Sequence, residues 1–193
     1  MPDVPGVTAA RAEQEHQRTV EISEAECVAK VAAGDQDAFG QLVAAHLPGI
    51  QLYAQRMTGN PAPAEDITQE VFLRLWLRAA EFDASKARLT TWLHRMAHNL
   101  AIDHLRKVQR DTPWGDEEDR RAAPESPEQQ SGKDVRDALL KLPERQRSAL
   151  ALTYYQDLSN REVAEVMGLG TRAVESLLVR ARGALKQHLE MAS

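Results

Sequence analysis

Residues 159–182, SNREVAEVMGLGTRAVESLLVRAR, have the pattern of two short helices joined by a tight turn. Ser159 and Glu162 have the spacing of a capping box, in which each side chain accepts a hydrogen bond from the backbone N–H of the other. Gly168 is placed to end the first helix in a left-handed conformation, and Thr171 is placed to cap the second helix. The stretch therefore predicts a helix-turn-helix, although ordinary helical hairpins with a basic solvated face share this pattern.

The second helix of this pair has two different faces. Its apolar positions recur at helical spacing and predict the side that packs on the rest of the domain. The opposite face carries hydrogen-bonding groups and positive charge, which are the groups that read base edges in a DNA major groove. The apolar positions are Val174, Leu177, Leu178, Ala181 and Leu185, and the polar face carries Arg172, Glu175, Ser176, Val179, Arg180 and Arg182.

The composition limits the classes of protein that the chain can be. Hydrophobic residues make up 42% of the 193 residues, which is enough for packed cores, whereas 5% aromatic residues argue against a β-sandwich or barrel. No apolar run approaches the length of a membrane span, and the N-terminal residues lack signal-peptide and transit-peptide features, so we expect a cytoplasmic protein. Cys27 is the only cysteine of the sequence, which excludes an intramolecular disulfide and a thiolate metal cluster.

Charge is distributed unevenly along the chain, whose net charge is −5. Residues 88–110 carry five basic residues against one acidic residue, and residues 172–188 carry four against one. Between them, residues 111–130 carry seven acidic residues against two arginines. Two basic segments separated by an acidic one indicate two DNA contacts and a linker. The modest local charge also predicts weak DNA binding by the isolated chain, because few phosphates are neutralised.

Helical periodicity predicts an all-α fold of two small domains, since no strand-like alternation of useful length occurs. We expect a disordered N-terminal extension over residues 1–22, a first helical domain over 23–108, a flexible acidic linker over 109–133 and a second helical domain over 134–190. The expected helices of the first domain run from a capping box at Ser23 and Glu26 to Gly34, from Ala38 to Met57, from Asp66 to Ala80, and onward from Thr90 or Thr91.

Four segments in this order, GDQDAFGQLV (34–43), DITQEVFLRLW (66–76), TWLHRMAHNLAIDHLRK (91–107) and LPERQRSALALTYYQDLSNREVAEVMGLGTRAVESLLVRAR (142–182), carry a family resemblance. Together they closely resemble the extracytoplasmic-function (ECF, group 4) sigma factors of the sigma-70 superfamily. The resemblance covers about residues 24–190. It implies an initiation factor with a region 2 bundle and a region 4 helix-turn-helix, which gives promoter recognition to the RNA polymerase core enzyme. It also implies control by an anti-sigma factor, without a cofactor.

The resemblance implies a role for three sets of residues. From the pattern alone, the polar stripe on the helix from Asp66 is a solvated face, whereas the resemblance makes it the surface that docks on the coiled coil of the largest polymerase subunit. The core-binding set is Asp66, Gln69, Glu70 and Arg74. The minus-ten DNA set is Arg88, Trp92, Arg95, Asn99, Asp103, Arg106 and Lys107. The minus-thirty-five DNA set is Thr171, Arg172, Glu175, Ser176, Val179, Arg180 and Arg182.

The chemistry of the minus-ten segment agrees with this role. Opening a promoter requires bases to be unstacked and held, which needs aromatic surface, amide hydrogen bonding and positive charge together. Trp92 and Asn99 supply the first two, although a tryptophan at a helix start also fits a core plug. His94 and His98 have metal-ligand spacing but no apparent third ligand, so we expect no metal site.

Three other functions are alternatives to a sigma factor. A sigma-like mimic would sequester an anti-sigma protein and lose promoter-reading residues, but Asn99 and Arg180 are retained here. A conventional helix-turn-helix repressor leaves the basic segment 88–110 unexplained. An enzyme is not expected, because the sequence has no phosphate loop and no nucleophile elbow. Many family members carry a basic residue where Glu175 stands, which leaves the exact promoter sequence open.

Overall fold

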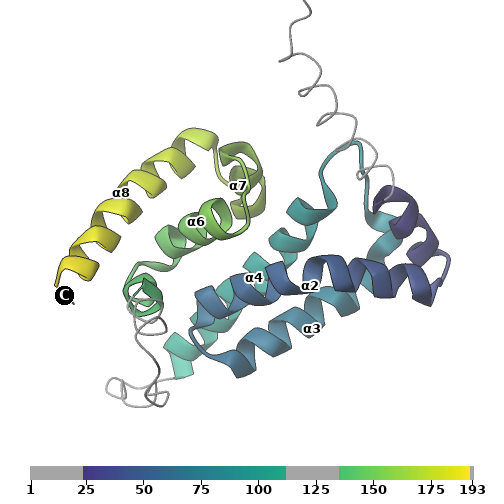
Figure 1. Ribbon diagram of the computed structural model, residues 1–193, viewed down its shortest axis with the longest axis horizontal. Helices are drawn as coiled ribbons and strands as arrows, with labels where there is room; N and C mark the ends of the chain where they lie inside the picture. The colour runs from purple at the N-terminus through teal and green to yellow at the C-terminus, as the bar shows by residue number, and fades with distance from the viewer. Residues whose placement is uncertain (1–23, 112–134, 192–193) are drawn as a thin grey trace, which may run out of the picture.

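The computed structural model describes residues 24–111 and 135–191, and within these ranges every regular element is a helix (Figure 1). This confirms the predicted all-α class of two helical domains. The expectations for Ser23, the N-terminal extension and residues 112–133 of the linker lie outside the described residues. The elements are α2 (Gln36–Thr58), α3 (Pro61–Arg78), the 3₁₀ helix η1 (Ala79–Glu81), α4 (Leu89–Asp111), α6 (Glu144–Tyr155), α7 (Asn160–Met167) and α8 (Thr171–Glu190), with further helical residues at 24–32 and 135–140.

The first domain is a bundle of α2, α3 and α4 with an apolar centre. Each helix buries residues three and four positions apart, which places them on one stripe facing the other helices. In α3 the buried stripe includes Ile67, Val71, Phe72 and Leu75. The best-buried side chains of the bundle are Ile50, Tyr53, Met57, Val71, Leu75, Leu89 and Leu93.

The turn between α2 and α3 forms where the sequence predicts it. Gly59 adopts a left-handed conformation with φ of 70° and ends α2, while the side chain of Asn60 caps α3 by accepting from the Ala62 N–H at 3.0 Å. Pro61 then occupies the first helical position, where its missing N–H costs nothing. The predicted start of this helix at Asp66 was therefore too late, because the proline belongs to the helix rather than to the turn.

The helix-turn-helix of α7 and α8 closes as predicted at its first helix. Ser159 and Glu162 form both hydrogen bonds of the capping box, and Gly168 ends α7 with φ of 64°. The predicted cap at Thr171 is wrong. Gly170 has the extended backbone of an N-cap, so Thr171 is already the first helical residue and no side chain caps α8.

The two domains pack directly against each other. Helix α6 lies against α2, and α7 lies against α4, so that their buried residues form one continuous apolar cluster (Figure 1). The linker composition predicted two tethered domains but gave no sign of this contact. Among the described helices, none combines the length and the apolar character needed to cross a membrane.

Candidate nucleic-acid interface

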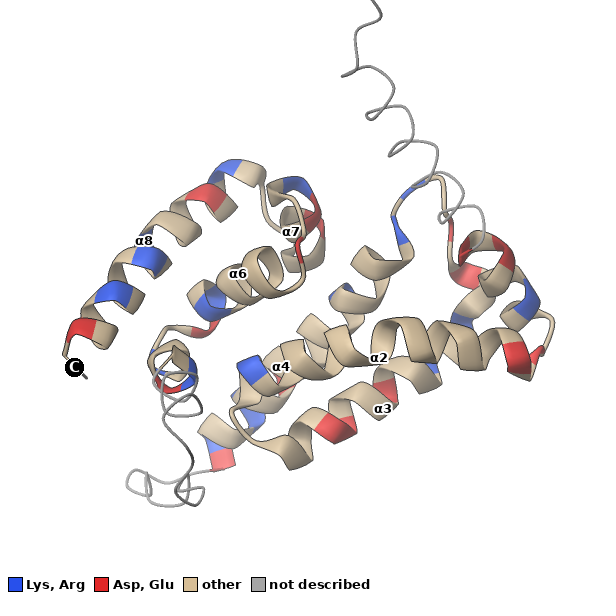
Figure 2. Ribbon diagram, in the orientation of Figure 1, with Lys and Arg blue, Asp and Glu red and all other residues tan. Residues whose placement is uncertain are grey.

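The outer face of α8 is open to solvent along the helix. All six residues of the predicted polar face are exposed, whereas Val174, Leu177, Leu178 and Ala181 are buried against α6 and α7. Leu185 is only half-buried. The predicted division of this helix into an inner and an outer face is therefore confirmed. Figure 2 shows basic residues along α8 with an acidic residue near its start.

Side chains on the outer face of α8 also bond to their own helix. Arg180 Nε donates to the Ser176 carbonyl at 3.2 Å, and Ser176 Oγ donates to the Arg172 carbonyl at 3.0 Å. Arg182 reaches back to α6, where its Nη1 donates to the Tyr154 hydroxyl at 3.4 Å. In the free chain, Arg180 thus lies along its own helix and Arg182 is turned toward α6, so both side chains would have to exchange these bonds to contact DNA.

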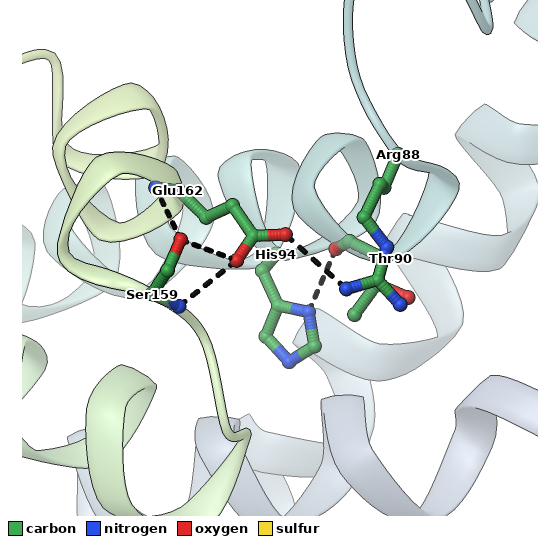
Figure 3. A network of polar contacts seen from close by, with 5 residues as sticks. All are labelled: Arg88, Thr90, His94, Ser159 and Glu162. Carbon is green, nitrogen blue, oxygen red and sulfur yellow. Dashed lines mark hydrogen bonds and ion pairs between the residues drawn. The ribbon is translucent and has the colours of Figure 1, made fainter. Parts of the chain in front are cut away.

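Glu162 holds the start of the helix-turn-helix and also reaches the first domain (Figure 3). Its Oε2 accepts from the Ser159 backbone N–H at 2.9 Å and from the Ser159 hydroxyl at 2.7 Å. Its Oε1 accepts from Arg88 Nη1 at 3.3 Å. Burial alone would raise the pKa of Glu162, but the hydrogen bonds from Ser159 and the charge of Arg88 outweigh it and lower that pKa. The carboxylate therefore stays ionised while it links two domains.

The minus-ten set follows one side of α4 and the loop before it. Arg88, Arg95, Asn99, Asp103, Arg106 and Lys107 are exposed. Trp92 is half-buried and its ring packs at 5.6 Å from the ring of Phe82, so part of this side chain serves the core. The structure thus brings the whole set onto one helix and its entry, and the DNA role of each member remains a prediction.

A polar cavity of about 480 Å³ separates part of this α4 face from the second domain. On the α4 side it is lined by Asn99, Asp103 and Arg106, all from the predicted minus-ten set. Residues of α6 and of the α7–α8 turn form the facing wall. The complete lining is Arg74, His98, Asn99, Ile102, Asp103, Arg106, Glu144, Arg145, Met167 and Leu169.

The predicted core-binding set lies on the outer side of α3. Asp66 and Gln69 are exposed, and Glu70 accepts from Arg74 Nε at 2.7 Å in a half-exposed ion pair. Sequence reasoning missed two leucines beside this set, Leu73 and Leu77, which are 51% and 68% exposed. Their spacing of four residues on an otherwise polar helix face was the available signal.

His94 and His98 are buried in the domain contact. His98 lies next to Tyr53 and Ser148, and His94 contacts the side chain of Gln156. Burial lowers the pKa of both imidazoles, that of His98 to about 4. Within residues 24–111 and 135–191, no group of three or more potential metal ligands comes together. The pair that sequence reasoning weighed as metal ligands thus makes hydrogen bonds between helices.

The sequence matches two families of known proteins in the order of the two domains. Residues 42–111 match Sigma-70 region 2, and residues 133–185 match Sigma-70 region 4. The first match spans α3 and α4 with most of α2, and the second contains the helix-turn-helix. The two predicted DNA-binding surfaces therefore fall in two different matched regions.

Individual relatives extend over most of the chain. The ECF RNA polymerase sigma factor SigW of Bacillus subtilis is 31% identical over 84% of this chain and 94% of its own length. The ECF RNA polymerase sigma factor RpoE of Cereibacter sphaeroides is 30% identical over 80% of this chain and 88% of its own length. The solved structure of CnrH, in complex with the cytosolic domain of CnrY, superposes with a TM-score of 0.71 at 29% identity, covering 89% of this chain and 99% of that chain. The chain therefore belongs to the ECF RNA polymerase sigma factors.

Proposed function

We propose that this protein is a group 4 sigma factor that binds core RNA polymerase and directs promoter-specific initiation of transcription in the cytoplasm, without catalysing a reaction of its own. The observation that carries the proposal is the presence of two basic, hydrogen-bonding surfaces on separate domains of one chain. One surface is the outer face of α8, and the other is the exposed side of α4. A conventional helix-turn-helix repressor with a ligand domain has no use for the second surface.

The α8 surface suits recognition of the duplex minus-thirty-five element. The inner face of α8 packs on α6 and α7, which leaves its outer face exposed, and the arginines, glutamate and serine there provide donors and acceptors for base edges. Val179 is 63% exposed, which leaves an apolar side chain free to contact a thymine methyl group. Thr171 contributes as the first helical residue, near the end where backbone N–H groups favour phosphate.

The α4 surface suits the melted minus-ten element. Asn99 is exposed on the same side as Arg95, Asp103 and Arg106, so an extruded base beside its amide would lie between charged groups. Arg88 and Lys107 extend positive charge to both ends of this face, in line with the strand backbone. In this proposal Asn99 reads the flipped base, and the cations hold the phosphates around it.

The outer side of α3 suits docking on the polymerase core. Its four polar residues are accessible, and the exposed Leu73 and Leu77 add apolar area next to them. Charged side chains around a small apolar centre are typical of specific protein interfaces. We therefore extend the proposed core-binding set by these two leucines.

An anti-sigma factor is the proposed regulator. CnrH is described in complex with CnrY, and the match to CnrH covers nearly all of both folds. The alternative, a mimic that sequesters an anti-sigma protein, does not explain why α4 and α8 both retain exposed DNA-reading side chains.

The test of this function is transcription by core polymerase with the full chain on the promoter upstream of its own gene. We expect a specific transcript that appears only when the chain is added. A chain that binds core polymerase or an anti-sigma protein but never yields a transcript would support the mimic.

A charge-reversal pair tests the α3 surface. We expect Asp66→Lys with Glu70→Lys to weaken core binding without changing helical circular dichroism, because both residues are on the exposed side of α3. Glu26→Lys with Glu165→Lys makes the same charge change at exposed positions on other helices and serves as the control. Equal core binding by both double variants would remove α3 from the interface.

A further inference from the structure

Polar side chains buried between the two domains form a continuous set of contacts. The centre of the set is a triangle of Tyr53, His98 and Ser148. The Tyr53 hydroxyl lies 3.0 Å from His98 Nδ1 and 2.9 Å from Ser148 Oγ, and Ser148 Oγ lies 3.0 Å from His98 Nδ1. Tyr53 and His98 belong to the first domain, whereas Ser148 belongs to α6 of the second. Tyr53 and Ser148 are fully buried and His98 is nearly so. Separation of the domains would therefore expose these three polar side chains to water.

A second contact joins His94 to Gln156, just beyond the end of α6. His94 Nδ1 lies 2.8 Å from the Thr90 carbonyl, so it must carry the proton in that bond. His94 Nε2 lies 3.1 Å from Gln156 Oε1, while the buried Gln156 Nε2 has no partner. Burial favours the neutral imidazole, which has a single N–H, so His94 Nε2 is an acceptor. Turning the Gln156 side-chain amide by 180° places its Nε2 against His94 Nε2. The amide then donates to the ring, and both groups have a partner.

Further contacts lie at both ends of the interface. At one end Arg88 pairs with Glu162 at 3.3 Å (Figure 3). At the other end Arg147 donates to the Met57 carbonyl at the end of α2. The guanidinium of Arg56 also stacks over the Tyr155 ring at 4.5 Å from its centroid. These contacts involve both termini of α6 and the start of α7, so they fix the orientation of the second domain as well as its position.

The contacts occupy the same helix that carries the proposed minus-ten surface. Arg88 is part of that surface and is engaged by Glu162, and His98 is the neighbour of Asn99. Asn99, Asp103 and Arg106 face Arg145 and residues of the α7–α8 turn across the polar cavity. A DNA strand that followed α4 from Arg88 to Lys107 would have to enter the space between α4 and α7, which pack on each other.

We propose that the chain inhibits itself: Ser148 and Gln156 of the second domain lock onto His98 and His94 of α4, and this closed state keeps melted promoter DNA off the minus-ten surface. The identity of the blocked activity rests on the function proposed above, whereas the lock itself is a property of the free chain. Core polymerase or promoter DNA would then bind the open state and shift the population toward it.

Gly49 offers a way to open the lock without touching the polar groups. It lies inside α2, and a Cβ built on it would stand 2.8 Å from Gln156 Oε1, with atoms of Gln156 as its nearest neighbours. Leucine is a better helix former than glycine, so Gly49→Leu favours α2 itself and fills the place of Gln156. Gly40→Leu makes the same change in the same helix at a position where nothing lies within 4 Å, and is the matched control.

The experiment measures the distance between the domains of the full chain in solution. Ala84→Cys, in the loop before α4, and Arg161→Cys, on α7, carry a fluorescent donor and acceptor in a Cys27→Ser background. Both positions are exposed, and the nearby Arg88–Glu162 ion pair shows that these two segments lie side by side in the closed chain. We expect high transfer efficiency in the parent and in Gly40→Leu, and low efficiency in Gly49→Leu. Gln156→Ala, which removes a contact without adding volume, should give a smaller change in the same direction. Equal efficiency in all four proteins, or low efficiency in the parent, would overturn the lock.

A second readout links opening to the blocked surface. The probe is a labelled pool of randomised single-stranded oligonucleotides, bound by the same proteins at fixed salt. If one molecule in about 100 is open, full opening raises the apparent affinity about 100-fold, so Gly49→Leu should bind more tightly than Gly40→Leu. Equal affinities despite separated domains would overturn the inhibition. Failure of every variant to bind core polymerase would instead overturn the proposed function, and the distance result would still decide the lock.

Discussion

The two proposed DNA-binding faces of this chain differ in what surrounds them. The outer face of α8 is open to solvent from Arg172 to Arg182, and its nearest contacts are with its own domain. The face of α4 is accessible residue by residue, but Arg88 is bound by Glu162 and Asn99 looks across a cavity toward α6 and α7. The face that would read intact duplex is thus ready to bind, and the face that would hold a melted strand is restricted.

This difference matches the two tasks. Reading base edges in a major groove needs one exposed helix and little change in the DNA. Holding an extruded base needs room beside the protein for a strand that has left the duplex. Under the proposed self-inhibition, closure of the domains would remove that room while leaving α8 exposed, so promoter search and promoter melting would be separable in this chain.

The largest expected effect is on stability, from truncating one buried leucine in the apolar core of each domain in turn. Leu152 in α6 and Leu75 in α3 are both fully buried, and truncation of such a leucine costs about 2–5 kcal/mol. We expect Leu152→Ala to speed hydrogen exchange in α8 while α3 stays protected, and Leu75→Ala to do the reverse. Exchange measured by mass spectrometry checks both. Loss of protection in all helices of both variants would mean that the two domains unfold as one unit. The faces on α8 and α4 would then not be stabilised independently.

A smaller effect is expected from single bases read by α8. An arginine–guanine pair contributes about 1–3 kcal/mol of discrimination, so Arg180→Ala should relax specificity at one promoter position by about 5- to 150-fold. Transcription from a promoter library randomised across the minus-thirty-five element measures this.

Glu175→Ala is the matched variant on the same exposed face. If Glu175 reads no base, an acidic group facing phosphates weakens binding to every sequence, so its removal should raise affinity uniformly. A loss confined to promoters with cytosine at one position would show instead that Glu175 reads that base. Identical uniform responses to both substitutions would show that α8 reads no base through them.

The domain contact should also respond to acid. Burial lowers the pKa of His98, and the positive charges of Arg106 on α4 and Arg145 on α6 act in the same direction, so that together they bring it from 6.5 to about 4. Tyr53 on α2 faces the same imidazole and stays protonated, because burial raises its pKa. An opened chain would bind a proton at His98 near the ordinary value, whereas the closed chain would not. The closed state should therefore be fully stable above pH 6.5 and lose up to about 1.4 kcal/mol per pH unit below it.

Interdomain energy transfer between about pH 7.5 and 5.5 measures this loss. The His94 pKa is lowered as well, by burial and by the nearby His46. Protonation of His94 should therefore also destabilise the closed state as the pH falls. Glu162 has a lowered pKa and releases the domains only at more acidic pH. His98→Gln keeps a hydrogen-bonding group without the titration and should flatten most of the response. An unchanged pH response in His98→Gln would assign the effect to other groups.

Structural features that depend on residues close together in the sequence could be predicted, and those that depend on distant residues could not. The capping box of Ser159 and Glu162, the left-handed Gly168 and the two faces of α8 depend on residues within a few positions, and all were predicted correctly. The prediction of Thr171 as the N-cap was wrong by one residue. The N-cap is set by which residue has the extended backbone, and here that residue is Gly170. The accessible sides of α3 and α4 followed from helical spacing.

The domain contact was not predictable in this way. Ser148 and Gln156 lie in ordinary helical surroundings, and their partners His98 and His94 are 50 and 62 residues away in the sequence. The acidic composition of the linker pointed to separation rather than contact. Two histidines and a tyrosine on apolar helix faces were the available signal, since buried polar groups require partners.

Asn99→Ala provides the most direct test of the account, measured as permanganate reactivity of the promoter in complexes of the full chain with core polymerase. Asn99 is exposed on α4 and is proposed to act only after the duplex opens. We predict unchanged core binding, unchanged closed-complex affinity and lowered reactivity of unpaired thymines in the minus-ten element. A variant that forms closed complexes poorly but melts the bound promoter normally would contradict the account, because Asn99 would then act on structure or on duplex DNA.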